Sequence, residues 1–196
     1  MFELDKITWL ETFQALLAID STTGCCREIE DYLADQIEDM GFEVIRPHKG
    51  GVIADLGGEG DTLCVTAHVD DIGLMVRRIN ADGTLNVCPV GGLHPFYAVM
   101  ENVRLHTRDG QTYTGAICRT PNSIHVTEEE LRQEMPDWRD NVCVVLDEDV
   151  RSDEDTRRLG IETGDMIALE PRLMCSNGYI KSRFVDDKAS AALLLC

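Results

Sequence analysis

The chain has 196 residues, of which 43% are hydrophobic and 28% are charged. This length suffices for one large domain or two small ones that bury roughly 70% of the unfolded surface, so we expect a globular protein. Asp and Glu number 36 against 18 Lys and Arg, and the net charge of -18 repels phosphate backbones and anionic lipids. Nucleic acid and membrane surfaces are therefore not expected as partners.

The start of the chain carries no basic region followed by an apolar stretch, and no segment approaches ~20 consecutive apolar residues. By default this predicts a cytoplasmic location. The eight cysteines include no C-x-x-C pair, so the sequence signals neither a zinc ribbon nor a redox pair. We expect most of these cysteines to be small buried core residues.

Two amphipathic helices are predicted first. One should run from about Asp5 to Ala18, with an apolar side and the Asp5 charge at its N-terminus. In the other, apolar residues recur at helical spacing up to Met40, and Gly41 suits the left-handed residue that ends a helix.

Short strands are expected next. Residues 42–45 read as one strand, and 51–56 are predicted to pair with 62–67 across the turn at 57–60. The run 62–67 is apolar and is followed directly by a histidine and two carboxylates. Two helices followed by such strands indicate an α/β layer.

After Gly73 the pattern changes to short strand-like runs separated by Asp-Gly and Gly-Asp turns, a spacing typical of a small β-barrel or sandwich. These runs are Leu74–Val90, Val99–Ile117, Val142–Leu146 and Met166–Glu170. Acidic stretches that begin at Thr127 and Ser152 are interpreted as helix starts, each a capping residue followed by first-turn acids.

The expected fold class is therefore α/β: an α/β layer, incomplete at its C-terminus, with an inserted small β-barrel-like domain. In this interpretation residues 1–73 and 172–196 belong to the α/β part and residues 74–171 form the insertion.

His68 and Asp70 stand two residues apart, so their side chains point the same way from an extended strand. An imidazole nitrogen and carboxylate oxygens suit Zn²⁺, Co²⁺ or Mn²⁺. We expect His68 to bind a metal while Asp70 accepts a hydrogen bond from the other ring nitrogen and fixes the tautomer. An isolated H-x-D is usually an ordinary strand end, but open α/β sheets hold their ligands beyond such apolar runs.

Asp186 and Asp187 precede a helix rich in small residues, and an N-cap is the simplest interpretation of adjacent aspartates there. Adjacent carboxylates normally diverge, so they do not face one substrate atom at ~5 to 9 Å, which argues against a carbohydrate-active hydrolase. One aspartate that bridges two ions ~3.5 to 4 Å apart is easier to build and belongs to two-metal hydrolysis.

Four motifs, in their order and spacing, resemble the M42 family of metalloaminopeptidases over essentially the whole chain. They are Ala67-His68-Val69-Asp70-Asp71-Ile72-Gly73-Leu74-Met75-Val76, Pro89-Val90-Gly91-Gly92, Gly160-Ile161-Glu162-Thr163-Gly164-Asp165 and Lys181-Ser182-Arg183-Phe184-Val185-Asp186-Asp187-Lys188. That family inserts a small β-rich domain directly after the H-x-D strand. The resemblance implies a hydrolase that uses two divalent metal ions to remove N-terminal residues from peptides, and a homo-oligomer assembled through the inserted domain.

By matching motif positions, the resemblance implies that His68 binds one ion of Zn, Co or Mn, that Asp186 bridges both ions, and that Asp70 is the catalytic residue that orients His68. Asp187 would support the site without binding metal, and the bond after Asp186 would be cis. Family members continue for well over a hundred further residues, which supply a Glu-Glu pair with the general base, another acidic ligand and a final histidine.

Two interpretations stay open. The chain is a metal-dependent aminopeptidase with only part of its active site, or a non-catalytic remnant or oligomerisation module of that family, because the remaining ligands and base have no counterpart here. The apolar run Ala191–Cys196 ends without a cap, so we expect either that the natural polypeptide is longer or that this is a fragment of a broken or partial reading frame. The other histidines are interpreted as surface or packing residues: His48, His94, His106 and His125.

Overall fold

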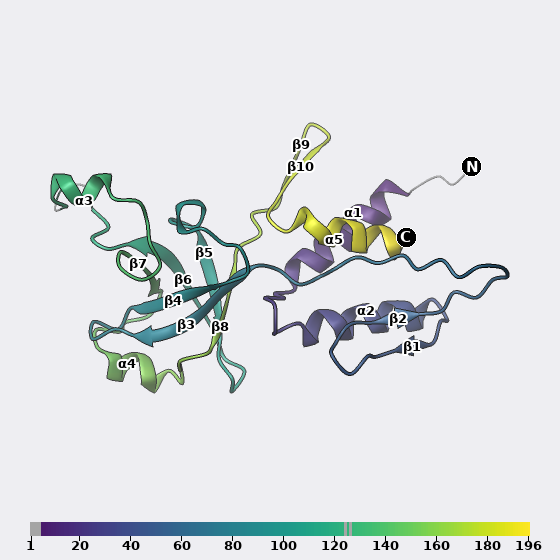
Figure 1. The fold of residues 1–196 in the computed structure, drawn as a ribbon, viewed down its shortest axis with the longest axis horizontal. Coiled ribbons are helices and arrows are strands. Elements are labelled where there is room, and N and C mark those ends of the chain that lie inside the picture. Colours follow the sequence, from purple (N-terminus) through teal and green to yellow (C-terminus); the bar gives the residue numbers. More distant parts are fainter. Residues whose placement is uncertain (1–4, 124, 126) are drawn as a thin grey trace. The chain divides into compact units, whose positions relative to one another are not determined.

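The structure is a computed structural model that describes residues 5–123, 125 and 127–196, and its chain divides into two compact units (Figure 1). Unit 1 comprises the chain up to Asp71 together with Pro171–Cys196, and unit 2 runs from Ile72 to Glu170. Whether these units are independent domains with the boundaries expected from the sequence stays a prediction. Within the described ranges, no helix has both the length and the apolar character needed to cross a lipid bilayer.

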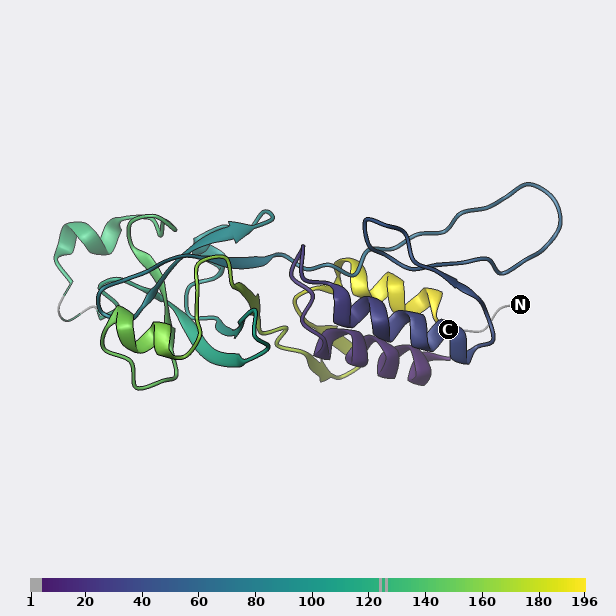
Figure 2. The same ribbon diagram turned by 90° about the horizontal axis from the view of Figure 1, so that it is seen from below.

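Three helices lie side by side in unit 1 (Figure 2): α1 (Lys6–Ala18), α2 (Arg27–Asp39) and α5 (Val185–Leu194). The two predicted N-terminal helices are confirmed. Asp5 caps α1 by accepting hydrogen bonds from the N–H groups of Ile7 and Thr8, and Gly41 has a φ of 89° just after α2. The helices share a core of side chains that are at most 6% exposed: Phe13, Leu16, Leu17, Ile29, Ala191 and Ala192.

Unit 1 also contains two short antiparallel strand pairs: β1 (Val44–Ile45) with β2 (Ile53–Ala54), and β9 (Met174–Ser176) with β10 (Tyr179–Lys181). Asn177 and Gly178 join the second pair and have φ values of 51° and 81°, as a two-residue hairpin of this kind requires. The sequence interpretation missed this hairpin, although Asn-Gly is the strongest short-range signal for one.

The predicted hairpin between 51–56 and 62–67 is wrong. β2 pairs with β1 instead, and in the described part of the chain 62–67 belongs to no strand ladder. Three glycines with positive φ lie in the intervening turn, and the chain leaves β2 in a wide loop (Figure 2). The apolar segment 62–67 consequently faces solvent, with Leu63 84% and Val65 62% exposed.

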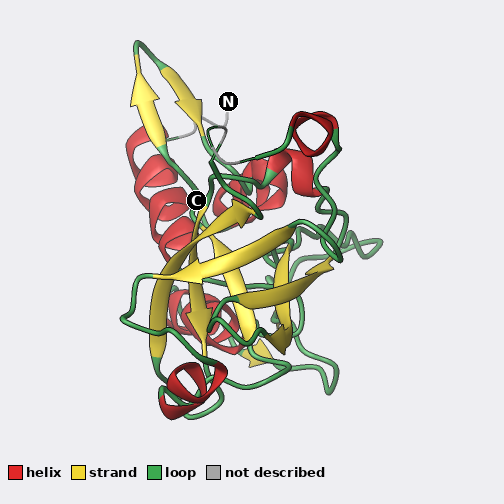
Figure 3. Cartoon of the chain, turned by 90° about the vertical axis from the view of Figure 1, so that its left-hand side faces the viewer, coloured by secondary structure: helices red, strands yellow, loops and turns green. Residues whose placement is uncertain are grey.

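Unit 2 is built around a closed barrel of antiparallel strands, which are among the yellow arrows of Figure 3. The strand order around the barrel is β3-β4-β7-β6-β5-β8. The strands are β3 (Gly73–Ile79), β4 (Leu85–Val90), β5 (Asn102–His106), β6 (Thr112–Arg119), β7 (Val142–Leu146) and β8 (Met166–Leu169). Pairing of Leu74 in β3 with Ile167 in β8 closes the barrel. The expected fold class, α/β with a barrel-like β region, is confirmed.

Local sequence explains this barrel. Gly83 and Gly110, in the Asp-Gly turns that follow β3 and β5, have φ values of 86° and 87°. At Gly115 the strands β6 and β7 approach so closely that a Cβ would clash with the carbonyl oxygen of Val145. The completely buried strand residues that fill the barrel are Leu74, Val76, Leu85, Val87, Leu105, Ile117, Val144, Ile167 and Leu169.

Three short helices complete unit 2: η1 (Pro95–Tyr97), α3 (Glu129–Gln133) and α4 (Asp153–Arg158). The predicted helix start at Ser152 is confirmed, because its hydroxyl accepts a hydrogen bond from the Asp155 N–H at 3.2 Å. α3 begins at Glu129, two residues after Thr127, and its N-cap position, Glu128, carries no side-chain cap. The capping role expected of Thr127 stays a prediction.

The expectation that most cysteines are buried is also wrong. Cys143 is the buried one, three are partly buried, and four are exposed: Cys25, Cys64, Cys175 and Cys196. All eight are free thiols. Cys64 is exposed because it lies in the segment 62–67, which pairs with no strand in the part of the chain that the structure describes.

Candidate functional site

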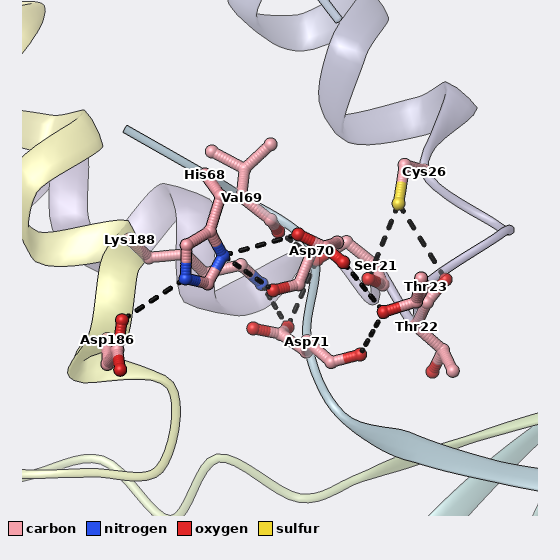
Figure 4. A network of polar contacts seen from close by, with 10 residues as sticks. All are labelled: Ser21, Thr22, Thr23, Cys26, His68, Val69, Asp70, Asp71, Asp186 and Lys188. Carbon is pink, nitrogen blue, oxygen red and sulfur yellow. Dashed lines mark hydrogen bonds and ion pairs between the residues drawn. The ribbon is translucent and has the colours of Figure 1, made fainter. Parts of the chain in front are cut away.

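The His68 imidazole and the Asp186 carboxylate meet in unit 1, although they are 118 positions apart in the sequence (Figure 4). His68 follows the segment 62–67, Asp186 lies in the first turn of α5, and His68 Nε2 is 3.1 Å from Asp186 Oδ1. Asp186 and Asp187 have non-helical backbone angles and are joined by a cis peptide bond, as the family resemblance implies.

The second ring nitrogen of His68 faces Asp70. Nδ1 lies 3.1 Å from the Asp70 carbonyl oxygen and 3.2 Å from Asp70 Oδ1. The other carboxylate oxygen, Oδ2, accepts a hydrogen bond of 2.7 Å from the Thr23 hydroxyl. Asp70 therefore lies between the Thr23 hydroxyl and the imidazole and contacts both.

This arrangement decides where a cation is favoured. Both atoms that face Nδ1 are acceptors, so Nδ1 carries a hydrogen, and Nε2 of the neutral ring is then a lone pair opposite a carboxylate oxygen. Two acceptors 3.1 Å apart repel each other unless a proton or a metal ion lies between them. Partial burial lowers the pKa of His68, but the hydrogen bond to Asp186 and the contacts with Asp70 outweigh it, and the pKa is raised above its usual value.

The donor set fits one side of a metal site. Zinc–ligand bonds of ~2.0 to 2.1 Å in tetrahedral geometry place neighbouring ligand atoms ~3.3 Å apart, close to the separation of Nε2 and Oδ1. Within residues 5–123, 125 and 127–196, however, no group of three or more His, Cys, Asp or Glu side chains could hold a metal ion. His68 and Asp186 supply two of the three or four protein ligands that such a site needs.

Next to this pair, Asp71 and Lys188 form a buried ion pair, with Asp71 Oδ2 2.6 Å from Lys188 Nζ. Burial raises the pKa of the Asp71 carboxyl, and the Lys188 charge and the Ser21 hydroxyl oppose this effect. Asp71 is 5% exposed and Lys188 1%, so neither faces the solvent that reaches His68.

The remaining predicted residues are not gathered at the pair. Among the described residues, Asp187 has no side-chain hydrogen bond or ion pair. His94 caps η1 by accepting a hydrogen bond from the Phe96 N–H, and His106 contacts the Thr112 hydroxyl, so both have local roles in unit 2. His48 and His125 are exposed.

Sequence reasoning missed Thr23 and Lys188. Thr23 lies in a polar stretch that was interpreted only as a turn, and no local signal indicates its contact with Asp70. Lys188 offered one, because it shares a helical face with Ala191 and Ala192, and all three are buried.

The chain combines an α/β unit with a closed β-barrel inserted into its sequence, and a histidine and an aspartate meet at the start of a helix. Known proteins resemble this chain in sequence and in fold. The sequence profile of the M42 glutamyl aminopeptidase family matches residues 50–196. The chain is 39% identical over 189 residues to the "Putative aminopeptidase YhfE" of Bacillus subtilis (strain 168), covering 95% of this chain and 54% of that protein. It is 27% identical to the glutamyl aminopeptidase of Lactococcus lactis subsp. cremoris (strain MG1363), covering 93% and 52%.

Solved structures share the fold. An aminopeptidase from the archaeon Desulfurococcus kamchatkensis superimposes with a TM-score of 0.81 at 25% identity, covering 95% of this chain and 50% of that one. The Pyrococcus horikoshii TET1 peptidase, described as able to assemble into a tetrahedron or a large octahedral shell, gives 0.81 at 23% identity, covering 95% and 54%. The chain belongs to the M42 glutamyl aminopeptidase family, and it spans about half the length of the curated relatives described above.

Proposed function

We propose that the chain contributes part of the active site of a metal-dependent aminopeptidase, which removes N-terminal residues from peptides with two divalent cations such as Zn²⁺, Co²⁺ or Mn²⁺. Membership of an aminopeptidase family supports the reaction class. The observation that carries the metal dependence is the approach of His68 Nε2 to Asp186 Oδ1 at 3.1 Å, with Asp70 behind the other ring nitrogen.

Each residue has a distinct role in this proposal. His68 would hold one cation through Nε2, and the Asp186 carboxylate would help to hold both cations. Asp70 holds the Nδ1 hydrogen, which fixes the tautomer and raises the basicity of the ligand nitrogen. A bound pair of divalent ions would polarise the scissile carbonyl and lower the pKa of a water molecule.

Metal binding tests the proposal directly. We expect isothermal titration of the purified chain with Co²⁺ to show binding that is lost in His68→Ala and in Asp186→Asn. His48→Ala is the matched control, since it removes an exposed histidine elsewhere in unit 1 and should leave the affinity unchanged. Equal affinity in the parent chain and in both site variants would overturn the proposal.

The second candidate function is a non-catalytic module of the same family. It is favoured by the donor count, because His68 and Asp186 have no third ligand in the described part of the chain. Metal-dependent release of p-nitroaniline from aminoacyl anilides, abolished by His68→Ala, supports a peptidase. Metal binding without any release supports the module.

Self-association through unit 2 is part of the proposal. Phe96, Tyr97 and Met100 are 56%, 69% and 79% exposed around η1, and the Phe96 and Tyr97 rings pack edge to face 5.2 Å apart. Such a cluster of exposed apolar side chains is typical of a protein-binding surface. We expect light scattering to give a mass that is a multiple of 21.9 kDa, and the double variant Phe96→Ser/Tyr97→Ser to lower it.

Phe42→Ser is the control for this experiment, because Phe42 is an exposed aromatic residue of unit 1. A parent chain that runs as a monomer, or an oligomer that the double variant leaves intact, would contradict assembly through this surface.

A further inference from the structure

The ammonium group of Lys188 is buried in unit 1 (Figure 4). Nζ donates hydrogen bonds to Asp71 Oδ2 at 2.6 Å and to the Ile19 carbonyl at 3.0 Å, and it lies 5.7 Å from the centroid of the Phe184 ring. Removal of an ammonium group from water carries a large free-energy penalty, which these partners offset. One residue of α5 thus bonds two other segments of unit 1.

Stability alone does not account for this ion pair. Asp71 Oδ1 is buried without a hydrogen-bond partner among the described residues. Replacement of a buried ion pair by apolar side chains of similar volume is often neutral or stabilising. The other buried residues of α5, Ala191 and Ala192, are apolar, so an apolar residue would also suit the position of Lys188. A charged pair at this position calls for a geometric explanation.

Asp71 is fixed by the chain around it. Its N–H donates to the Ser21 carbonyl at 2.8 Å, and its carbonyl accepts from the Thr23 N–H at 3.0 Å. The Ser21 hydroxyl lies 3.0 Å from Asp71 Oδ2 and 2.7 Å from the Val69 carbonyl. The carboxylate of Asp71 is therefore a rigid anchor three residues after His68.

The contact between His68 and Asp186 cannot fix its own geometry. These side chains are 53% and 95% exposed, and exposed ion pairs of this kind contribute little to stability. Lys188 follows Asp186 by two residues, and Asp71 follows His68 by three. The buried pair therefore ties together the two segments that carry the exposed pair.

We propose that Asp71 and Lys188 are positioning residues, whose buried ion pair sets the separation between the His68 imidazole and the Asp186 carboxylate. The geometric claim concerns the metal-free chain, and only its consequence for metal binding rests on the proposed function. The buried pair touches neither the cations nor the substrate and acts through His68 and Asp186.

The decisive variant replaces the pair by apolar side chains of similar shape, Asp71→Leu/Lys188→Met. Leucine has the branching of aspartate and methionine the length of lysine, so the folded unit keeps its packing while the ion pair is lost. If the ion pair only stabilises the fold, a stably folded double variant should keep the contact between His68 and Asp186. If the ion pair positions these residues, the double variant should fold but lose that contact.

Three measurements separate these outcomes. Unit 1 contains Trp9 and unit 2 contains Trp138, so Trp9 fluorescence in a Trp138→Phe background follows urea unfolding of unit 1 alone. The ¹⁵N shifts of the His68 ring in the metal-free chain report its hydrogen bonds. Isothermal titration with Co²⁺ gives the affinity.

We expect the double variant to unfold near the urea concentration of the parent, to show altered His68 ring shifts, and to bind Co²⁺ about tenfold more weakly. Leu17→Ala is the control, because it weakens the buried helical core of unit 1 without touching either pair, and it should lower the unfolding midpoint with unchanged affinity and ring shifts. Lys188→Arg keeps the charge and should retain more affinity than Lys188→Met.

A folded double variant with parental ring shifts would overturn the proposal. If the double variant does not fold, the comparison of Lys188→Arg with Lys188→Met decides, and equal ring shifts in these two variants would also overturn it. Failure of the parent to bind Co²⁺ would contradict the proposed function alone, since the ring shifts are measured without metal.

Discussion

The apolar segments of the two units differ in pairing and in burial. In unit 2 each barrel strand pairs with two neighbours, and Leu105 in β5 is completely buried. In unit 1 the segment 62–67 has a comparable apolar content, but Leu63 is 84% exposed and no strand of the described chain pairs with it. The barrel strands therefore form backbone hydrogen bonds with their neighbours and bury apolar side chains such as Leu105. The segment that leads to His68 pairs with no described strand, and its Leu63 side chain is exposed.

Because of this difference, a few polar contacts must hold His68 in position. Since 62–67 pairs with no described strand, His68 takes its position from the residues that follow. Asp71 forms an isolated parallel bridge with Thr22, and Asp70 is held by the Thr23 hydroxyl. The contrast between the closed barrel and the segment 62–67, which pairs with no described strand, predicts measurable effects of decreasing size.

Hydrogen exchange should show the largest effect. Amides in the centre of the barrel, such as that of Leu105, exchange only when unit 2 unfolds, which slows them by roughly 10³-fold or more for a domain of ordinary stability. Amides of Leu63 and Val65 pair with no strand among the described residues and should exchange at nearly unprotected rates. Strong protection of these two amides in the isolated chain would show that 62–67 acquires a partner strand in solution.

Truncation of a leucine to alanine should change the stability of the two units by very different amounts. Leu105→Ala removes a completely buried side chain and should destabilise unit 2 by about 2 to 5 kcal/mol. Leu63→Ala removes an exposed one and should change the stability of unit 1 by no more than about 0.5 kcal/mol. Urea unfolding followed by Trp138 or by Trp9, each in a background without the other, measures the two effects. A large loss on truncation of Leu63 would contradict the exposure of the segment.

A glycine tests how tightly the barrel closes. Gly115→Ala places a Cβ against the Val145 carbonyl and should destabilise unit 2 by about 1 to 3 kcal/mol, since backbone atoms of β6 and β7 must move apart. Gly92→Ala is the matched control, because no atom lies within 4 Å of its added Cβ. Equal midpoints for both variants by Trp138 fluorescence would show that the two strands are farther apart than in this structure.

Local signals explain why the barrel was predictable. The turns at Gly83 and Gly110 specify their hairpins within a few residues, so short-range chemistry sets the strand order there. The segment 62–67 failed because strand pairing is decided by neighbours elsewhere in the chain, and an apolar run carries no information about whether they exist. The missed hairpin at Asn177 had a local signal that was not used.

The candidate site was predictable to a different degree. The pairing of His68 with Asp70 follows from a two-residue spacing in an extended segment, and the structure brings them together. The approach of Asp186 over 118 positions was expected only through the family resemblance, because no local pattern specifies so distant a contact. Lys188 was interpretable as a buried residue from helical phase, but its partner was not.

The smallest expected effect is a pH dependence of stability that arises from a buried carboxyl group in unit 2, Asp165, which is compared with Asp71 in unit 1. Asp71 Oδ2 lies 2.6 Å from Lys188 Nζ, whereas Asp165 Oδ1 in unit 2 lies 4.0 Å from Arg108 Nε. Burial raises the pKa of Asp165, and the Glu162 N–H and the Arg108 charge lower it only in part. The folded state therefore holds its proton more tightly than the unfolded chain, so the protonated group stabilises unit 2, and this contribution is lost as the pH rises through the raised pKa.

Asp165→Asn removes that titration and keeps an oxygen for the Glu162 N–H. Starting from a pH near the ordinary aspartate value of about 3.9, the stability of the parent relative to this variant should decline as the pH rises toward neutrality. Asp149→Asn, at an 84% exposed position, controls for the change in net charge. Urea midpoints of unit 2 at a series of pH values measure the trend. A parent that gains stability over Asp165→Asn with rising pH would mean that the Arg108 charge and the Glu162 N–H outweigh the effect of burial on Asp165.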